Sequence, residues 1–150
     1  PSYDDLLKKV DTYLRTIEYM PLGKPVYGAI TSKYGQRTDP LNNKQGFHVG
    51  VDIRGKHGTK IRATAAGVVV KAFRNGGYGN YVEIDHGNGY VTRYAHNKAN
   101  LVAVGDKVEK GQAIALMGAT GRATGPNLHF EVVQNGRRVN PVNFIRNASN

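Results

Sequence analysis

The chain has 150 residues, and its 21 lysines and arginines outnumber its 11 aspartates and glutamates, giving a formal charge of +10. This length allows one domain with a hydrophobic core, and the charge favours anionic partners such as nucleic acid, lipid surfaces or cell-wall polymers. The positive residues are scattered and not interleaved with aromatic residues, which argues against nucleic acid. Because cysteine is absent, disulfides and thiolate metal sites are excluded, and a metal must use His, Asp or Glu.

The first twenty residues are expected to form one amphipathic helix. Apolar residues recur at helical spacing at positions 6, 7, 10, 14 and 17, and Pro21 ends the run. Ser2 is the expected N-cap, with Asp4 and Asp5 in the first turn. We expect this helix to pack on the domain or to end a longer upstream coil; a partner contact through residues 2–20 is the alternative.

After this helix the pattern changes to short apolar runs with period two, separated by glycine and asparagine. The runs VVVKAF, NYVEID, YVTRYAH, AIALMG and NLHFEVV are predicted strands, and HGNG at 86–89 and RNGGYG at 74–79 are predicted hairpin turns. The expected fold is mainly β, with antiparallel sheets in a small sandwich or half-barrel. We divide the chain into helix and linker at 1–22, one domain at 23–146 and a tail at 147–150.

The stretch FHVGVDI at 47–53 is predicted to be a strand on which His48, Gly50 and Asp52 share one face. The alternate positions are expected in the core: Val49, Val51 and Ile53. Gly50 would leave space between the two polar groups for an ion or a substrate. A histidine and an aspartate on one face suit a nitrogen and oxygen ligand pair for zinc.

Two further strands carry histidines. In NLHFEVV the alternation places Asn127, His129 and Glu131 on one face, and in YVTRYAH it places Tyr94 and His96 together. Three of the five histidines thus lie at inward-facing or cleft-facing positions of predicted strands, and a set of two histidines and one aspartate would leave a fourth zinc position open, as in catalytic rather than structural sites. The remaining histidines, His57 and His86, are expected at the surface without a role.

The ordered motifs GFHVGVDI, YAH, GPNLHFEV and GDKVEKGQAIALMGATG closely resemble the LytM and lysostaphin type of zinc metallopeptidase, which cleaves peptide cross-links of bacterial peptidoglycan. The resemblance runs from about Pro25 to Pro141. It implies one zinc ion bound by His48, Asp52 and His129, with His96 as a catalytic histidine that is not a ligand. The family's second catalytic histidine would stand at position 127, where this sequence has Asn127.

The expected activity is therefore a zinc-dependent endopeptidase acting on peptidoglycan peptides through a metal-activated water. A carboxamide at position 127 can donate a hydrogen bond but does not titrate, so weakened activity is expected. The alternative is a non-catalytic cell-wall-binding or regulatory module that keeps the zinc site. Either function implies a location in the bacterial cell envelope, periplasmic or extracellular. An envelope partner, or an anchor in a segment outside this sequence, is compatible with either function. No membrane span is expected within these 150 residues.

A third class is suggested by GDKVEKGQAIALMG, which resembles the hairpin of biotin or lipoyl carrier domains. Such carriers present a modified lysine at a tight turn, and Lys107 and Lys110 lie near turn glycines. A carrier would leave the histidines and the aspartate of the metal motif without a purpose, so this class is disfavoured.

Overall fold

The computed structural model describes residues 2–38 and 45–145. Within them, antiparallel strands dominate, and each end of the described chain carries a helix. In chain order the elements are α1 (Tyr3–Glu18), β1 (Ile30–Ser32), β2 (Gly35–Thr38), β3 (Gln45–His48), β4 (Val51–Arg54), β5 (Lys60–Arg62), β6 (Gly67–Asn75), β7 (Gly79–Gly87), β8 (Tyr90–Asn100), β9 (Lys107–Val108), β10 (Ala113–Met117), β11 (Asn127–Gln134), β12 (Arg137–Val139) and α2 (Val142–Ile145). The predicted mainly β class is confirmed, while the predicted tail at 147–150 lies outside the described residues.

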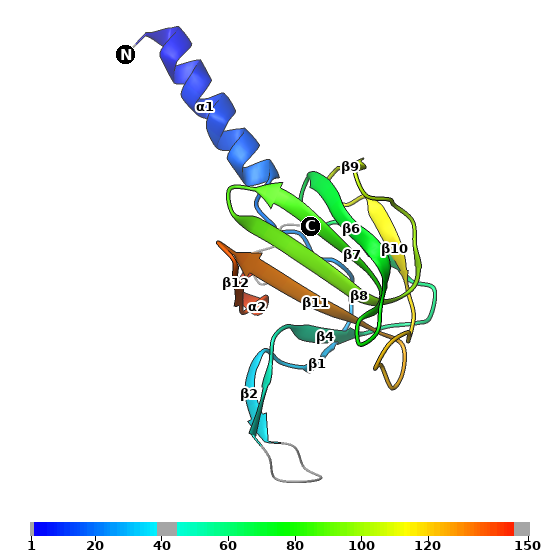
Figure 1. Ribbon diagram of the computed structural model, residues 1–150. Helices are drawn as coiled ribbons and strands as arrows, with labels where there is room; N and C mark the ends of the chain where they lie inside the picture. The colour runs from blue at the N-terminus through cyan, green and yellow to red at the C-terminus, as the bar shows by residue number, and fades with distance from the viewer. Residues whose placement is uncertain (1, 39–44, 146–150) are drawn as a thin grey trace.

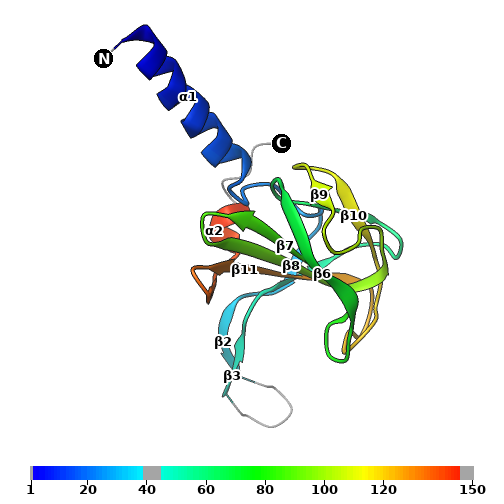
Figure 2. The same ribbon diagram turned by 45° about the horizontal axis from the view of Figure 1, so that its top comes forward.

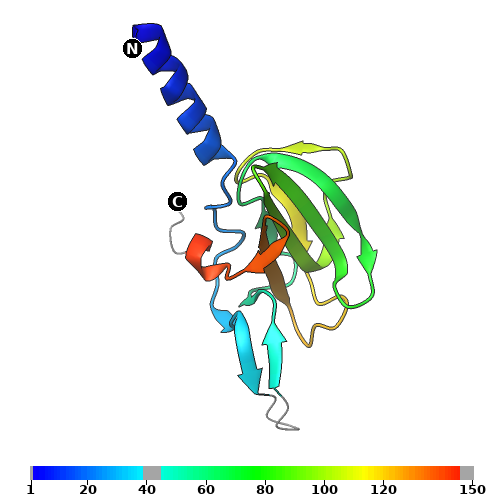
Figure 3. The ribbon, with the colours of Figure 1, turned by 60° about the vertical axis from the view of Figure 1, so that its left-hand side comes forward.

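One curved sheet organises the described part of the domain. Its ten strands follow the order β1-β4-β11-β8-β7-β6-β9, with β12 paired to β11 and β10 paired to both β8 and β5. Figures 1 and 2 show β9 and β10 lying to one side of the long strands β6, β7 and β8. Strands β2 and β3 form a separate two-stranded sheet that extends from the end of the domain opposite helix α1 (Figure 3).

Both predicted hairpin turns are present. Strands β7 and β8 are joined at Asn88 and Gly89, whose φ angles of 52° and 86° are both in the left-handed region. Asparagine followed by glycine is the preferred pair for a two-residue turn of this kind. Strands β6 and β7 pair antiparallel across the longer turn at 76–78, which places Tyr78 just before β7.

The predicted single strand at 47–53 is wrong in one respect. The chain breaks its pairing at Val49 and Gly50, so that His48 ends β3 and Asp52 belongs to β4. Val51 and Ile53 are buried as expected, with exposures of 0% and 2%. Val49 is half-buried and lines a pocket instead of the core, because strict alternation does not continue through the break.

The core lies against the inward face of the sheet and is built from the alternating apolar positions of its central strands. Leu128, Phe130 and Val132 of β11 are buried, and the rings of Phe130 and Tyr94 lie 5.4 Å apart. Burying side chains of this size contributes roughly 1.5–3 kcal/mol each. The packed face therefore fixes which face of β11 carries the polar residues.

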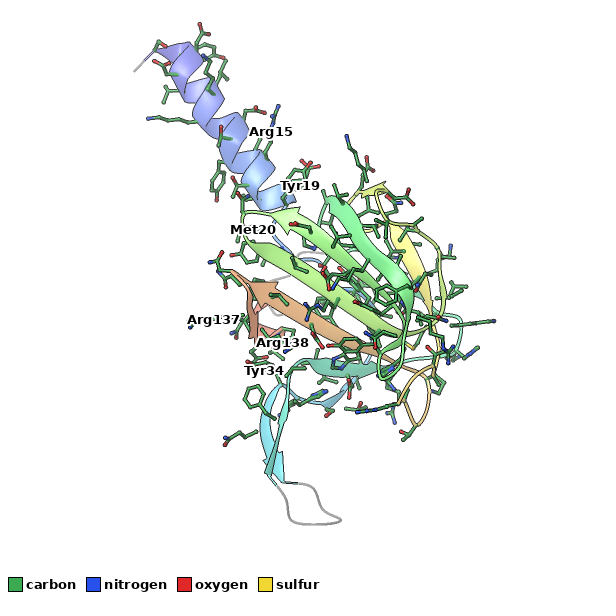
Figure 4. The ribbon with its side chains drawn as sticks, in the orientation of Figure 1. Arg15, Tyr19, Met20, Tyr34, Arg137 and Arg138 are labelled. Atoms are coloured by element: carbon green, nitrogen blue, oxygen red, sulfur yellow. The ribbon has the colours of Figure 1, made fainter. Side chains whose placement is uncertain are left out.

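Helix α1 begins with the predicted Ser2 cap. Ser2 and Asp5 form a reciprocal capping box, in which each side chain accepts a hydrogen bond from the other's backbone N–H. None of the helix residues is buried, and Leu14 on its apolar face is 58% exposed. Figure 4 shows its side chains, Arg15 among them, standing clear of the sheet, so the expected packing on the domain is not found. No described helix has the length and apolar character to cross a membrane.

The expected surface position of His86 is also wrong, whereas His57 is exposed. His86 is 3% exposed, and its Nδ1 donates to the Ala66 carbonyl oxygen at 2.7 Å. Its Nε2 lies 2.7 Å from the Thr92 hydroxyl. The same hydroxyl also lies 2.7 Å from the buried Tyr94 hydroxyl. Burial lowers the pKa of His86 and keeps the imidazole neutral.

This buried histidine predicts acid sensitivity of the fold. A histidine whose pKa is lowered by folding gives stability that is present above its unfolded pKa of about 6.5 and is lost as the pH falls below it. We expect His86→Gln to be less stable at pH 7 but to reduce the acid slope of the unfolding free energy by up to about 1.4 kcal/mol per pH unit. Denaturant titrations between pH 7 and 5 measure this slope, and exposed His57→Gln is the control. Equal slopes for wild type and His86→Gln would contradict the assignment.

Candidate functional site

Three side chains from two distant segments meet at one end of β4 and β11. The antiparallel pairing of these strands sets His129 directly opposite Asp52. His129 Nδ1 lies 2.8 Å from Asp52 Oδ1, and His48 Nε2 lies 3.5 Å from Asp52 Oδ2. One possible ligand atom from each residue lies within 4.8 Å of the other two. The structure thus brings His48, Asp52 and His129 together around one point.

Gly50 has a different role from the expected one. A Cβ at this position would lie 2.5 Å from the carbonyl oxygen of Phe130 and 3.0 Å from Cε1 of His129. The missing side chain therefore allows the chain between β3 and β4 to lie against β11. Gly50 thus permits this close approach of the chain, and the space it leaves is taken up by β11.

A backbone carbonyl orients His48. Its Nδ1 lies 2.9 Å from the Lys33 carbonyl oxygen, which can only accept a hydrogen bond. Nδ1 therefore carries a hydrogen, and Nε2 is the nitrogen directed toward Asp52. This arrangement matches that of metal-binding histidines, whose second nitrogen is held by a carbonyl or a carboxylate.

Glu131 plays the same part for His129 and is the residue that sequence reasoning left without a role. Its Oε2 lies 2.8 Å from His129 Nε2 and accepts a 2.6 Å hydrogen bond from the Tyr78 hydroxyl. Its Oε1 accepts from Arg93 at 3.1 Å and from Arg138 at 3.2 Å. Nε2–H is donated to this fully buried carboxylate, and Nδ1 faces Asp52. Burial alone would lower the pKa of His129, but hydrogen bonds with Asp52 and Glu131 raise it to about 9, so a metal ion at Nδ1 would displace a proton.

The electrostatics keep both carboxyl groups ionised. Burial by itself would raise the pKa of Asp52, but hydrogen bonds with His129 and His48 outweigh it and hold the pKa well below its usual range. Burial likewise opposes ionisation of Glu131, yet hydrogen bonds with His129 and Tyr78 bring its pKa down to about 2. Asp52 is thus available as an anionic ligand, and Glu131 remains a hydrogen-bond acceptor for the ring.

The donor set fits a divalent metal ion of the zinc type. Two imidazole nitrogens and one carboxylate oxygen converge, and each ring's other nitrogen has its own partner. Such nitrogen and oxygen sets with three protein ligands are characteristic of catalytic zinc, whose fourth position is left for water or substrate. His48, Asp52 and His129 are the residues that would hold the ion.

His96 lies beside this group, with its ring centroid 5.9 Å from that of His129. Its Nδ1 donates to the Thr120 carbonyl oxygen at 2.8 Å, which leaves Nε2 as the acceptor nitrogen. Burial lowers the pKa of His96, so the ring is neutral near pH 7 and able to take up a proton.

The prediction that the side chains of Tyr94 and His96 share one face of their strand is wrong. Tyr94 is fully buried in the core, whereas His96 lines the pocket. The register of β7 and β8 shifts between the Asn80–Asn97 and Val82–Tyr94 pairs, and His96 has a φ of 69°. This bulge breaks the alternation and re-aims the histidine.

Asn127 begins β11 and is not among the residues that line the pocket. Its amide Nδ2 donates to the Gly125 carbonyl oxygen at 2.8 Å, while its buried Oδ1 has no hydrogen-bond partner among the described residues. The asparagine therefore holds the turn before β11 and brings no titratable group to the site.

An open pocket of about 450 Å³ gives access to the site. The three donor residues and His96 line it together with Asn75, Gly77, Tyr78 and Arg122. Asn75, Gly77 and Tyr78 come from the end of β6 and the turn that joins it to β7. The predicted hairpin at 74–79 thus supplies part of the pocket wall.

Comparison with known proteins identifies the family. The model of peptidase family M23 matches residues 46–141, which include His48, Asp52, His96 and His129. The chain belongs to peptidase family M23. The resemblance seen in the sequence motifs is thereby confirmed.

Relatives and solved structures agree with this assignment. The chain is 45% identical over 105 residues to the peptidoglycan DD-endopeptidase ShyA of Vibrio cholerae, covering 70% of this chain and 24% of that protein. A zinc containing peptidase from Vibrio cholerae superposes with a TM-score of 0.74 at 40% identity, covering 78% of this chain and 37% of that one. The catalytic domain of lysostaphin from Staphylococcus simulans gives 0.71 at 32%, covering 79% and 92%. The chain spans about a quarter of the length of the curated relatives it matches.

The contact between Glu131 and His129 predicts an effect on metal affinity. Glu131→Gln should weaken zinc binding by roughly 10-fold to 100-fold, because the ring loses the carboxylate that fixes its tautomer. Competition with a chelating dye measures the dissociation constant. Glu83→Gln is the matched control, since Glu83 binds Arg93 but no ligand histidine. Tyr78→Phe, which removes one hydrogen bond to Glu131, should weaken zinc binding less; wild-type affinity in both variants would contradict this role.

Proposed function

We propose that this chain is the catalytic domain of a zinc-dependent endopeptidase that cleaves peptide bonds of bacterial peptidoglycan. The observation that carries the proposal is the convergence of His48, Asp52 and His129, each with a possible ligand atom directed inward, beside His96 in an open pocket. Membership of family M23 supports the peptidase activity. The name of ShyA supports peptidoglycan as the substrate, and the zinc containing neighbour supports the identity of the metal.

The side chains have separate roles in the proposed hydrolysis. His48, Asp52 and His129 would hold a zinc ion, which as a Lewis acid would polarise the scissile carbonyl and lower the pKa of water. His96 Nε2 accepts a proton from the attacking water as the oxygen bonds to the carbonyl carbon. The protonated His96 then gives this proton to the amine nitrogen as the C–N bond breaks. Thr120 keeps the ring oriented through Nδ1.

The charge of the protein suits this substrate. A formal charge of +10 favours binding to a wall rich in carboxylates and anionic polymers. Action on the wall places the protein in the bacterial envelope or outside the cell. The exposed apolar face of α1 is the surface proposed to meet an upstream coil or an envelope partner.

A wall-binding module without turnover is the second candidate, and Asn127 is the observation that favours it. No imidazole or carboxyl group occupies position 127, and the amide is engaged with Gly125. The inward-directed donor set and the neutral His96 favour the enzyme, because both would be unnecessary for binding alone.

Purified protein loaded with zinc should release new amino termini from peptidoglycan. His96→Ala should keep one zinc ion per chain but lose roughly 10²-fold to 10⁴-fold in rate, because it removes the proton acceptor and no ligand. His129→Ala should lose stoichiometric zinc as well as activity. Amino-terminus labelling and elemental analysis measure the two properties. Wall binding without release by zinc-loaded wild type would favour the module, and stoichiometric zinc in His129→Ala would remove this residue from the site.

Restoring the second histidine tests the effect of Asn127. Asn127→His should raise the rate of hydrolysis, by on the order of 10²-fold if the second proton carrier limits turnover. Initial rates on purified peptidoglycan measure the change, with zinc content checked in both proteins. Asn127→Gln, which adds length but no titratable group, is the matched control. An unchanged rate in Asn127→His would show that His96 suffices.

A further inference from the structure

Among the described residues that line the pocket, Arg122 is the only lysine or arginine. It lies in the loop between β10 and β11, and its side chain is exposed. Asp52 is the only carboxylate that the described part of the chain contributes to this lining, and it is already engaged by His48 and His129. Once a divalent ion is bound, the pocket has an excess of positive charge, which favours an anionic ligand.

Arg122 differs from the two arginines that contact Glu131 in having no carboxylate partner among the described residues. Arg93 and Arg138 both donate to the buried Glu131, and Arg93 also donates to Glu83. Within residues 2–38 and 45–145, no carboxylate forms an ion pair with the Arg122 guanidinium. Its five N–H donors are therefore available to a ligand in the pocket.

The loop that carries Arg122 is held in place by glycines. The Arg122 N–H donates to the Gly77 carbonyl oxygen at 3.0 Å. A Cβ on Gly121 would lie 2.5 Å from both that oxygen and the Gly79 nitrogen, so only glycine allows the two loops to come this close. The Arg122 side chain lies over Gly77, with Nε 3.5 Å from the place where a Cβ would be.

The same loop orients His96. Thr120, two residues before Arg122, accepts the hydrogen bond from His96 Nδ1 and donates its hydroxyl to the Asn97 carbonyl oxygen at 2.7 Å. One short loop therefore positions both the proposed proton acceptor and an unpaired guanidinium in the same pocket. A group bound by Arg122 would therefore lie in the same pocket as the bond that is cleaved.

Resting on the proposed function, we propose that Arg122 binds a free carboxylate of the substrate beside the scissile bond. The planar guanidinium matches a carboxylate with two parallel hydrogen bonds, and such charge-assisted pairs are stronger than neutral ones. The substrate class is then a stem-peptide cross-link that carries an ionised carboxylate near the cleaved bond. Amidated stem peptides and bridges without carboxylates are poorer substrates.

Two forms of one synthetic cross-linked stem-peptide dimer test this proposal, with the carboxyl group nearest the cross-link either free or amidated. Zinc-loaded wild type should show a kcat/KM roughly 10-fold to 100-fold higher for the free form. Arg122→Gln should lose this preference by slowing cleavage of the free form alone. Arg74→Gln, on the neighbouring hairpin but outside the pocket lining, should keep it. Zinc content should be the same in all three proteins.

Equal rates for the two dimers with wild type, or an equal loss on both dimers in Arg122→Gln, would overturn the proposal. The second result would show that Arg122 acts on the reacting carbonyl or on the loop. If wild type cleaves neither dimer, titration calorimetry measures the dissociation constant of each dimer, and the ratio of the two constants gives the preference for the free form. A preference for the free form without cleavage would contradict the endopeptidase but support the carboxylate site, and equal affinities would contradict the carboxylate site.

Discussion

The antiparallel register of β4 and β11 is the constraint on which the site depends. It joins residues 77 positions apart, so that the carboxylate of Asp52 and the ring of His129 meet at 2.8 Å. A slip of one residue would turn every side chain of one strand to the opposite face, which would bury Asp52 and expose Ile53. The core on the other face resists this slip, because Val51 and Phe130 are fully buried. Packing on one face thus maintains the geometry on the other.

The buried Glu131 shows how the site is supported from behind. An unpaired buried carboxylate is costly, and removing one partner of a buried ion pair is strongly destabilising. Here Tyr78, Arg93, Arg138 and His129 all lie within hydrogen-bond distance of it. The arginines keep the charge in place, and the charge orients the ligand histidine. The same hydrogen bonds therefore serve the fold and the proposed metal site.

Much of the fold could be predicted from local patterns. Alternation in NLHFEVV and the HGNG turn identified β11 and the β7–β8 hairpin, because both depend on residues close in sequence. The places where prediction failed are those where the backbone departs from regular geometry. The break at Val49 and the bulge at His96 change the direction of side chains, and neither has a local signal. His86 was misplaced because its partners come from elsewhere in the chain.

Strand alternation indicated the candidate histidines and Asp52, and the family resemblance of the motifs gave them their roles, but the surroundings of the site could not be predicted in either way. The sequence placed Glu131 on the same face as His129, yet its contacts with arginines on other strands depend on the folded sheet. Arg122 likewise reaches the pocket only because two glycine-containing loops pack together.

Zinc-edge X-ray absorption of the zinc-loaded protein tests the central claim most directly, because it reports the ligands of the ion itself. We expect one site with two imidazole nitrogens at about 2.0–2.1 Å and carboxylate or water oxygens at about 2.0–2.2 Å. The imidazole signal should fall from two rings to one when His48 is replaced. An ion with no imidazole scattering, or a spectrum unchanged by that replacement, would contradict the account.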